Sequence, residues 1–232
     1  MTDQFQRNRV VIGDKAQESL FHKKVIVFGV GGVGAALIET LARMGIENIT
    51  IVDYDVVDIT NINRQIIAFH DTIGMKKVDV SESNLKRINP NIKVKKIYEK
   101  LSLDNIEDFN LKDYDYIADC IDTISAKIAL CEYAYKNNIN IISSMGAGNR
   151  LNPTDVSITD IYKTSYCPLA RVMRRELKKR GVKKLKVVSS KEVVKVKSMQ
   201  KENIRKSVPG SVSFMPPVFG LMMASEIIKD MI

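Results

Sequence analysis

A glycine-rich turn between an apolar run and a helical pattern constrains this chain more than any other feature. In the stretch VIVFGVGGVGAAL, Gly29, Gly31 and Gly34 have the spacing G-x-G-x-x-G. These glycines let the backbone turn tightly, and a helix that begins near Gly32 directs unpaired N–H groups and a positive dipole end toward an anion. Asp53 ends the next apolar run, where its carboxylate can accept hydrogen bonds from ribose hydroxyls. The combination predicts a strand–turn–helix unit that binds an adenosine-containing nucleotide.

Short β-rich runs alternate with longer helical patterns through the first 150 residues. Strands are expected over 25–29, 49–53, 92–99, 114–122 and 139–146, and helices over 32–45, 75–89 and 124–138. Such alternation is typical of doubly wound sheets with right-handed crossovers. The predicted fold is therefore Rossmann-like α/β: a mostly parallel sheet with helices on both faces and with added C-terminal strands and helices.

The pattern changes after residue 150. A strand over 156–162 is expected to join the sheet, followed by a helix over 168–181, a short strand over 184–190 and a basic, turn-rich loop over 190–211. The last apolar segment is interrupted by two prolines, Glu226 and Lys229, which favours a core-facing helix over a membrane span. The N-terminus lacks the apolar core of a signal peptide, so we expect a cytoplasmic protein.

Positive charge is concentrated in one segment. The chain carries 36 Lys and Arg against 27 Asp and Glu, and residues 163–206 alone hold 16 basic and three acidic residues. This distribution favours a phosphate-rich partner such as nucleic acid, although a solvated charged face has the same composition. The candidate contact residues on and after the basic helix are Arg171, Arg174, Arg175, Lys178, Lys179, Lys183 and Lys184.

Cysteine and histidine usage excludes two common classes of site. Cys120, Cys131 and Cys167 form no C-x-x-C pair, and the chain has two histidines. A structural zinc site and a disulfide scaffold are therefore not expected. Cys120 and Cys131 fall within a predicted strand and helix, which indicates core positions. Cys167 lies in a predicted loop, where a small structural cysteine and a covalent nucleophile both stay open.

Polar residues beyond the glycine turn bear on which nucleotide is bound. The loop DITNINRQ supplies Asn61, Arg64 and Gln65, and Lys77 begins the next helical pattern. A nicotinamide site leaves such a cluster unexplained, whereas guanidinium and ammonium groups match the charge of a triphosphate. Asp122 is the last residue of the strand expected over 114–122, at the sheet edge where such folds bind ligands, and a carboxylate beside a triphosphate suits Mg²⁺.

The motifs GVGGVG (29–34), DYD (53–55), NINRQ (61–65), GMKKV (74–78), RINP (87–90) and DCIDT (119–123) resemble the adenylating superfamily of ubiquitin-activating enzymes and their bacterial relatives. The resemblance implies ATP and Mg²⁺ as cofactors, with Asp122 serving the metal. It also implies a homodimer in which an N-terminal arginine, Arg7 with Arg9 as a rival, reaches the partner's ATP. The implied catalytic residues are Arg7, Arg64, Lys77 and Asp122. The implied ATP-binding residues are Gly29, Gly31, Gly32, Gly34, Asp53, Asp55, Asn61, Arg64, Gln65 and Lys77.

The segments RNRVVIGDKAQESL, 157–181 and 208–230 are similar to the tRNA threonylcarbamoyladenosine dehydratase family within that superfamily. This resemblance implies ATP-dependent cyclisation of the modified adenosine: the threonyl carboxylate is adenylated, and intramolecular ring closure releases AMP. It also implies one adenylating domain over 1–232, with a nucleotide-binding core at 1–150 and a basic extension at 151–232. A sulfur-transfer protein is a further possible partner.

Three other functions stay open from the sequence. One is the activation of a small sulfur-carrier or ubiquitin-like protein at its C-terminus, although members of that group usually carry the zinc cysteines that this chain lacks. The others are an NAD-dependent oxidoreductase and a tRNA-binding protein without catalysis, and both leave part of the polar cluster without a role.

Overall fold

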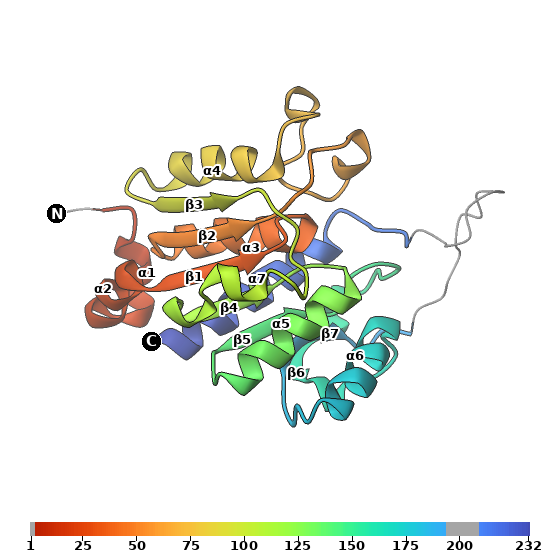
Figure 1. Cartoon of the computed structure of the whole chain (residues 1–232). Helices are drawn as coiled ribbons and strands as arrows, with labels where there is room; N and C mark the ends of the chain where they lie inside the picture. Colours follow the sequence, from red (N-terminus) through yellow and green to blue (C-terminus); the bar gives the residue numbers. More distant parts are fainter. Residues whose placement is uncertain (1–2, 194–208) are drawn as a thin grey trace.

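The computed structural model describes residues 3–193 and 209–232, and its centre is one seven-stranded sheet (Figure 1). The spatial order is β3-β2-β1-β4-β5-β7-β6, and neighbouring strands are parallel except for β6, which runs antiparallel to β7 at one edge. The strands are β1 (Lys24–Phe28), β2 (Asn48–Val52), β3 (Lys93–Ile97), β4 (Tyr116–Asp119), β5 (Ile141–Ser144), β6 (Val156–Asp160) and β7 (Lys186–Ser190). This topology confirms the predicted doubly wound α/β fold.

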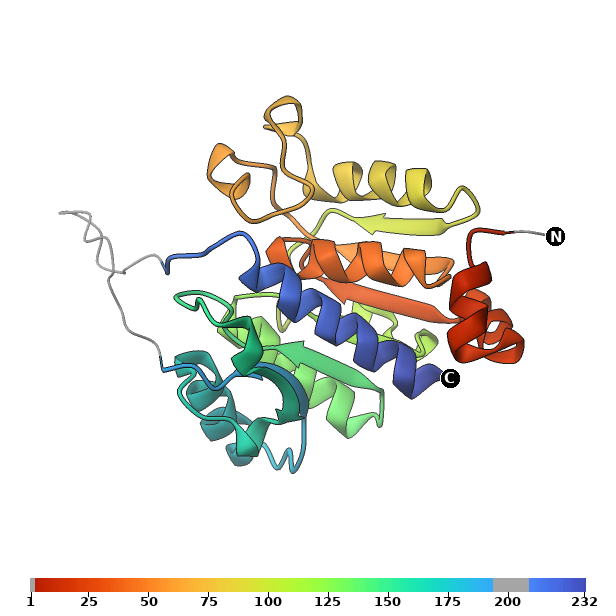
Figure 2. The ribbon, with the colours of Figure 1, turned by 180° about the vertical axis from the view of Figure 1, so that it is seen from behind.

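Helices cover both faces of the sheet (Figures 1 and 2). They are α1 (Gln6–Ile12), α2 (Asp14–His22), α3 (Gly32–Arg43), α4 (Lys77–Ile88), α5 (Ile124–Lys136), α6 (Pro168–Lys179) and α7 (Met215–Met231). Helices α3, α4 and α7 pack on one face, and α5 and α6 pack on the other. Strand β1 is buried on both sides: Val25 and Val27 face α3 and α7, while Ile26 and Phe28 face α5. Double burial explains why the central strands are almost entirely apolar.

The C-terminal helix α7 runs back across the sheet beside α3 (Figure 2). The two helices approach closely at Gly220, where an added Cβ would lie 2.3 Å from the Val33 carbonyl oxygen. Phe219, Met223 and Ile227 are fully buried, so the prediction of a core-facing terminal helix is confirmed. Among the described residues, none of the helices has the length and apolar character needed to cross a membrane.

The two N-terminal helices, α1 and α2, were not predicted from the sequence. Helices α1 and α2 are short and meet at Gly13, whose φ of +83° places it in the left-handed region. The rings of Phe5 and Phe21 pack with their centroids 5.2 Å apart and hold α1 and α2 together. This tertiary contact stabilises two short helices whose local sequence only weakly favours a helix. The expected loop over 190–211 falls largely on 194–208, outside the described residues.

Candidate functional site

A cavity of about 460 Å³ opens at the carboxyl edge of the sheet, where the chain order reverses between β1 and β4. Open α/β sheets bind ligands at this switch point because the loops after β1 and β4 leave the sheet toward opposite faces. Most of the predicted nucleotide residues line the cavity: Gly29, Gly31, Gly32, Asp53, Asp55, Asn61, Arg64, Gln65, Lys77 and Asp122. The structure therefore brings residues from five separate sequence motifs to one place.

The glycine turn has both conformational and steric reasons for its composition. Gly29 has a φ of +85°, a backbone conformation that residues other than glycine rarely adopt. Gly34 does not line the cavity; it lies under the turn, where an added Cβ would come within 1.8 Å of the Gly29 carbonyl oxygen. A Cβ on Gly32 would lie 2.8 Å from Cβ of Pro216 on α7. Helix α3 can consequently begin directly at the cavity with its first N–H groups exposed to it.

Asp53 ties the end of β2 to the glycine turn. Its carboxylate accepts hydrogen bonds from the backbone N–H of Val30 and of Asp55, each at 2.8 Å. Burial raises the pKa of Asp53, while these two N–H donors act in the opposite direction. Each oxygen retains acceptor capacity for a ribose hydroxyl. Asp53 thus shapes the turn in addition to facing the cavity.

Lys77 is the first residue of α4 and is 5 % exposed. Its ammonium group lies 2.8 Å from the carboxylate of Asp55, which is itself about half exposed. The buried ammonium group is therefore paired with a carboxylate that still meets solvent, which keeps the Lys77 charge compensated at the cavity wall. Phosphate oxygens entering the cavity would meet this ammonium group.

The loop between β2 and α4 presents Arg64 and Gln65 to the cavity. One 3₁₀ turn, Ile59–Asn61, begins here with a capping box, in which Asp58 accepts from the Thr60 N–H and Asn61 accepts from the Asp58 N–H. The Arg64 guanidinium donates to the Thr60 carbonyl at 2.6 Å and to the Asn63 side chain at 2.9 Å. These bonds fix the loop and direct a guanidinium to the cavity rim.

Gln65 is 7 % exposed, and its amide oxygen has no hydrogen-bond partner among residues 3–193 and 209–232. Its amide nitrogen would lie 3.6 Å from a Cβ added to Gly31. A buried amide group that is only partly satisfied costs free energy unless a ligand completes its hydrogen bonds. This observation suits a polar ligand on the glycine turn.

Asp122 follows β4 and lines the same cavity as the loop after β2. Tyr54 lines the same cavity as these acids, and burial, followed by the charges of Asp55, Asp122 and Asp53, raises the pKa of its hydroxyl. No group of three metal-binding side chains occurs in the part of the chain that the structure describes. A magnesium ion bound with a nucleotide typically takes one or two carboxylates, phosphate oxygens and water, which these acids can supply.

Several cavity residues were missed by the sequence analysis. They come from the loops after β3 and β5, from the segment before α7 and from the first turn of α7: Glu99, Lys100, Leu101, Ala147, Gly148, Pro209, Gly210, Ser211 and Pro216. The carboxyl-edge rule could have pointed to the two loops. No local signal marks Gly210, which reaches the cavity because its N–H and C=O both bond to Asn149, at 2.7 and 2.8 Å.

Arg7 lies on α1, at the edge of the sheet where the strands begin, and does not line the cavity of its own chain (Figure 1). It is exposed, and no side-chain bond joins it to the rest of the described chain. The rival Arg9 is engaged instead: its guanidinium lies 3.2 Å from Asp3 and 2.8 Å from Glu18. Of the two arginines, Arg9 is therefore held within the described chain and Arg7 is not.

The basic residues of α6 are not equivalent. Arg171, Lys178, Lys179, Lys183 and Lys184 are exposed, but the Arg174 guanidinium donates to the carbonyl and hydroxyl of Thr164. Glu176 sits among Arg175, Lys179 and Arg180, and these cations lower its pKa to about 2. Helix α6 starts beside Gly146, after β5, and its last residues lead to the opposite edge, where β7 begins. Arg171 is thus the candidate nearest the edge that carries the cavity.

The cysteines differ in their surroundings. Cys167 is 3 % exposed, lies outside the cavity lining and caps α6, with its sulfur accepting from the Ala170 N–H at 3.5 Å. Cys131 is buried as expected. Cys120 lines the cavity, but burial and the neighbouring Asp119 raise its pKa, which disfavours a thiolate. This geometry assigns Cys167 to a helix cap rather than to covalent chemistry.

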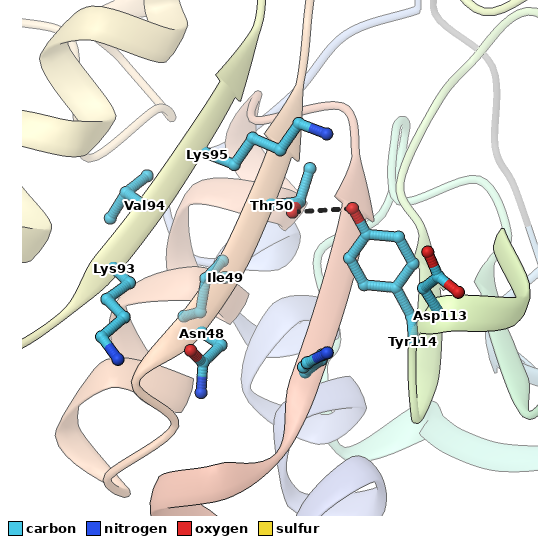
Figure 3. Close-up of a pocket in the computed structure, with 9 residues that line it drawn as sticks. Asn48, Ile49, Thr50, Lys93, Val94, Lys95, Asp113 and Tyr114 are labelled. Carbon is cyan, nitrogen blue, oxygen red and sulfur yellow. Dashed lines mark hydrogen bonds between the residues drawn. The ribbon is translucent and has the colours of Figure 1, made fainter. Parts of the chain in front are cut away.

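A second hollow, of about 390 Å³, lies over the first residues of β1, β2 and β3 (Figure 3). Thr50 and Tyr114 share a 3.0 Å hydrogen bond there, and Lys93 and Lys95 project from the edge strand β3 (Figure 3). Lysines on an edge strand discourage pairing with another sheet. These lysines protect the edge of the sheet, and the hollow lies at the opposite end of the strands from the glycine turn.

Comparisons with known proteins are consistent with a ligand site in this cavity. The ThiF family pattern matches residues 5–232. A tRNA threonylcarbamoyladenosine dehydratase of Bacillus subtilis is 41 % identical, over 100 % of this chain and 96 % of the relative. The structure of Escherichia coli TcdA, a tRNA N6-threonylcarbamoyladenosine dehydratase, in complex with AMP has a TM-score of 0.90 and 31 % identity, and the alignment covers 98 % of this chain and 93 % of that one.

The same enzyme in complex with ATP gives a TM-score of 0.89, whereas Escherichia coli MccB, at 20 % identity and a TM-score of 0.70, shares the fold alone. Full-length identity to a dehydratase, the family pattern and the geometry of the switch-point cavity all lead to one assignment. The chain belongs to the ThiF family, in the group of the tRNA threonylcarbamoyladenosine dehydratases.

Proposed function

We propose that this protein is an ATP-dependent tRNA threonylcarbamoyladenosine dehydratase that converts the modified adenosine to its cyclic form. The observation that carries the proposal is the convergence of the glycine turn, Arg64, Lys77 and Asp122 on one cavity at the switch point. A nicotinamide site requires neither cation. The full-length similarity to dehydratases supports the tRNA substrate, and a cytoplasmic location follows from that substrate.

The proposed reaction has two steps. An oxygen of the threonyl carboxylate attacks the α-phosphorus of ATP, the bond from that phosphorus to the bridging oxygen breaks, and pyrophosphate leaves. The carbamoyl group of the same side chain then attacks the acyl carbon of the adenylate. The acyl–oxygen bond breaks, AMP leaves, and a proton passes to solvent. The net change in the nucleoside is the loss of one water.

The residues at the cavity act mainly by position and charge. A carboxylate and a triphosphate repel each other, and Arg64 and Lys77 offset this repulsion while stabilising the charge that grows on pyrophosphate. Asp53 orients the ribose, and the N–H groups at the start of α3 face the phosphates. Asp122 is the residue that would hold Mg²⁺, which supplies further charge neutralisation on the phosphates.

Two protomers are proposed to share each site. Arg7 does not line the cavity of its own chain, and the neighbouring α1 residues Val10 and Val11 are 84 % and 83 % exposed, as expected for an uncovered contact. A symmetric dimer that buries these valines would bring Arg7 to the partner's ATP. We further propose that 1–150 and 151–232 act as one adenylating domain, because β6 and β7 extend the same sheet. The proposal of a sulfur-transfer protein as a further partner rests on the sequence resemblance alone.

Mixing two inactive variants tests the shared site. In a heterodimer of Arg7→Ala and Arg64→Ala chains, one site receives both wild-type arginines and the other receives neither. Random exchange of equal amounts should restore about a quarter of wild-type activity, since half of the dimers are mixed and each has one intact site. Activity that stays at the level of the single variants contradicts a contribution of Arg7 across the interface.

The activity itself is tested by incubating the protein with ATP, Mg²⁺ and tRNA that carries the linear modification, followed by mass analysis of the nucleosides. Loss of water from the modified adenosine with release of AMP supports the proposal. Parallel reactions replace the tRNA with a small sulfur-carrier protein and follow pyrophosphate exchange. Exchange that depends on the protein and not on tRNA contradicts the dehydratase assignment.

A further inference from the structure

A fully buried ion pair lies directly beneath the cavity, and none of the roles described above uses it. Asp119 ends β4, Lys127 belongs to α5, and both side chains are 0 % exposed. The ammonium nitrogen of Lys127 lies 2.8 Å from Oδ2 of Asp119. The hydroxyl of Ser143 on β5 donates to the same oxygen at 2.6 Å, and the Cys131 thiol lies 3.7 Å from it.

Stability alone is a weak reason to keep such a pair. Removing two charges from water carries a large desolvation cost, and well-packed apolar residues of similar volume are often as stabilising as a buried ion pair. Cys131 adds no charge, because burial and the nearby Asp119 raise its pKa well above its usual range. The cluster therefore carries a desolvation cost that apolar residues at the same core position between β4 and α5 would not carry.

The hydrogen bonds of Asp119 lead to the cavity wall. Oδ1 accepts from the backbone N–H of Ile121 at 3.3 Å, whereas Oδ2 receives the bonds from α5 and β5. One carboxylate thus joins three elements. The loop 120–123 supplies four cavity residues in sequence, and the loop after β5 supplies Ala147 and Gly148. The N–H of Lys127 also bonds to the Thr123 carbonyl at 3.0 Å, which closes the first turn of α5 onto the same loop.

We propose that Asp119 and Lys127 are positioning residues that set the loop 120–123 so that the Asp122 carboxylate faces the phosphates of the nucleotide. The inference deepens the proposed function and rests on it for the role of Asp122. It predicts that the hydrogen-bond acceptor at position 119, rather than the charge of the pair, determines the loop position.

Two double variants separate the acceptor from the charge. Asp119→Leu/Lys127→Met removes both. Asp119→Asn/Lys127→Met removes the charges but keeps an oxygen that can accept from the Ile121 N–H, while the amide nitrogen in place of Oδ2 can donate to the Ser143 hydroxyl oxygen. Both variants avoid a lone buried charge, so both are expected to fold. The matched control, Tyr116→Phe, removes a buried hydrogen bond to Asp230 from the other end of β4.

The measurements are amide hydrogen exchange over 120–125, ATP affinity, and the rate and Mg²⁺ requirement of tRNA-dependent pyrophosphate release. The leucine–methionine variant should exchange faster over 120–125, bind ATP nearly normally, require more Mg²⁺ and turn over about a hundredfold more slowly, because small misplacements near reacting groups cost this much. The asparagine–methionine variant should recover most of the rate. Tyr116→Phe should lower the melting temperature without changing exchange at this loop.

Equal turnover and exchange in the leucine–methionine variant and the wild type would overturn the proposal. So would equal losses of turnover in both double variants, because the acceptor would then make no difference. If the wild-type protein shows no tRNA-dependent turnover, the proposed function fails, but the exchange measurement still decides whether Asp119 holds the loop.

Discussion

The cavity at the carboxyl edge and the basic helix α6 both present charge to a phosphate-bearing ligand, but they hold that charge differently. In the cavity, Lys77 and Asp53 are almost completely buried, and Asp53 is bound to backbone N–H groups. On α6, the exposed basic side chains surround one acid, Glu176, or meet solvent. The charged groups of the cavity are thus held in fixed positions by burial and hydrogen bonds, whereas the side chains of α6 supply positive charge at the surface without fixed positions.

This contrast predicts different responses to substitution. Removing one group from a preorganised site should have a large effect on a single step, because the neighbouring groups cannot move to replace it. Removing one cation from a surface field should have a small effect, since exposed charges are screened and partly interchangeable. The following predictions test that difference, from the largest expected effect to the smallest.

Arg64→Ala should lower the rate of adenylation by about a hundredfold or more, the usual cost of removing one preorganised transition-state contact. Pyrophosphate release in the presence of tRNA measures this rate, and circular dichroism checks the fold. Arg87→Ala, an exposed arginine outside the cavity lining, is the matched control and should retain the wild-type rate. Near-normal turnover of Arg64→Ala would remove this residue from the mechanism.

Gly32→Ala should destabilise the protein by about 1–3 kcal/mol, the typical cost of overpacking. The added Cβ would lie 2.8 Å from Pro216 and 3.1 Å from the Arg64 carbonyl, so we also expect weaker ATP binding. Gly146→Ala meets only an ordinary contact, 3.6 Å from the Cys167 sulfur, and should melt near the wild-type temperature. If both variants melt alike in thermal denaturation, α7 does not restrict the turn.

Neutralising Arg171, Lys178, Lys183 and Lys184 together to glutamine should weaken tRNA binding and flatten its salt dependence. The log–log slope should fall by about 0.7–0.9 for each phosphate that the helix no longer neutralises. ATP affinity should not change. A control with the same change in charge replaces the exposed Lys15, Lys86, Lys93 and Lys112. Equal reduction of tRNA affinity in the two variants would indicate that net charge matters and that α6 does not.

Glu176→Gln should have the smallest effect. Its pKa is lowered to about 2 from an ordinary 4.5, so the native state favours the ionised form. The stabilisation is therefore present above about pH 4.5 and is lost as the pH falls toward 2. The melting temperatures of variant and wild type should differ slightly at pH 7 and converge in acid. A difference that persists at pH 2 would show that packing, not charge, is responsible.

Much of the fold follows from local patterns. The central strands are apolar throughout because both sheet faces are covered, and the helices between them have recognisable lengths and ends. Predicted boundaries are too long at several ends: β4 ends at Asp119 rather than at 122, and α6 ends at Lys179 rather than at 181. Helices α1 and α2 escaped prediction because their stability comes from the Phe5–Phe21 contact, which short local patterns do not reveal.

The sequence by itself determined the glycine turn, the acidic residue after β2 and the polar loop beyond it, because their spacing follows from the local geometry of a strand, a turn and a helix. Only the tertiary structure decided why Gly32 is a glycine, since Pro216 comes from the far end of the chain. It also decided that Arg7 lies at the edge away from its own cavity and that Gly210 forms part of the wall. Contacts between segments distant in sequence depend on how the whole sheet and its helices pack, and no local pattern encodes that packing.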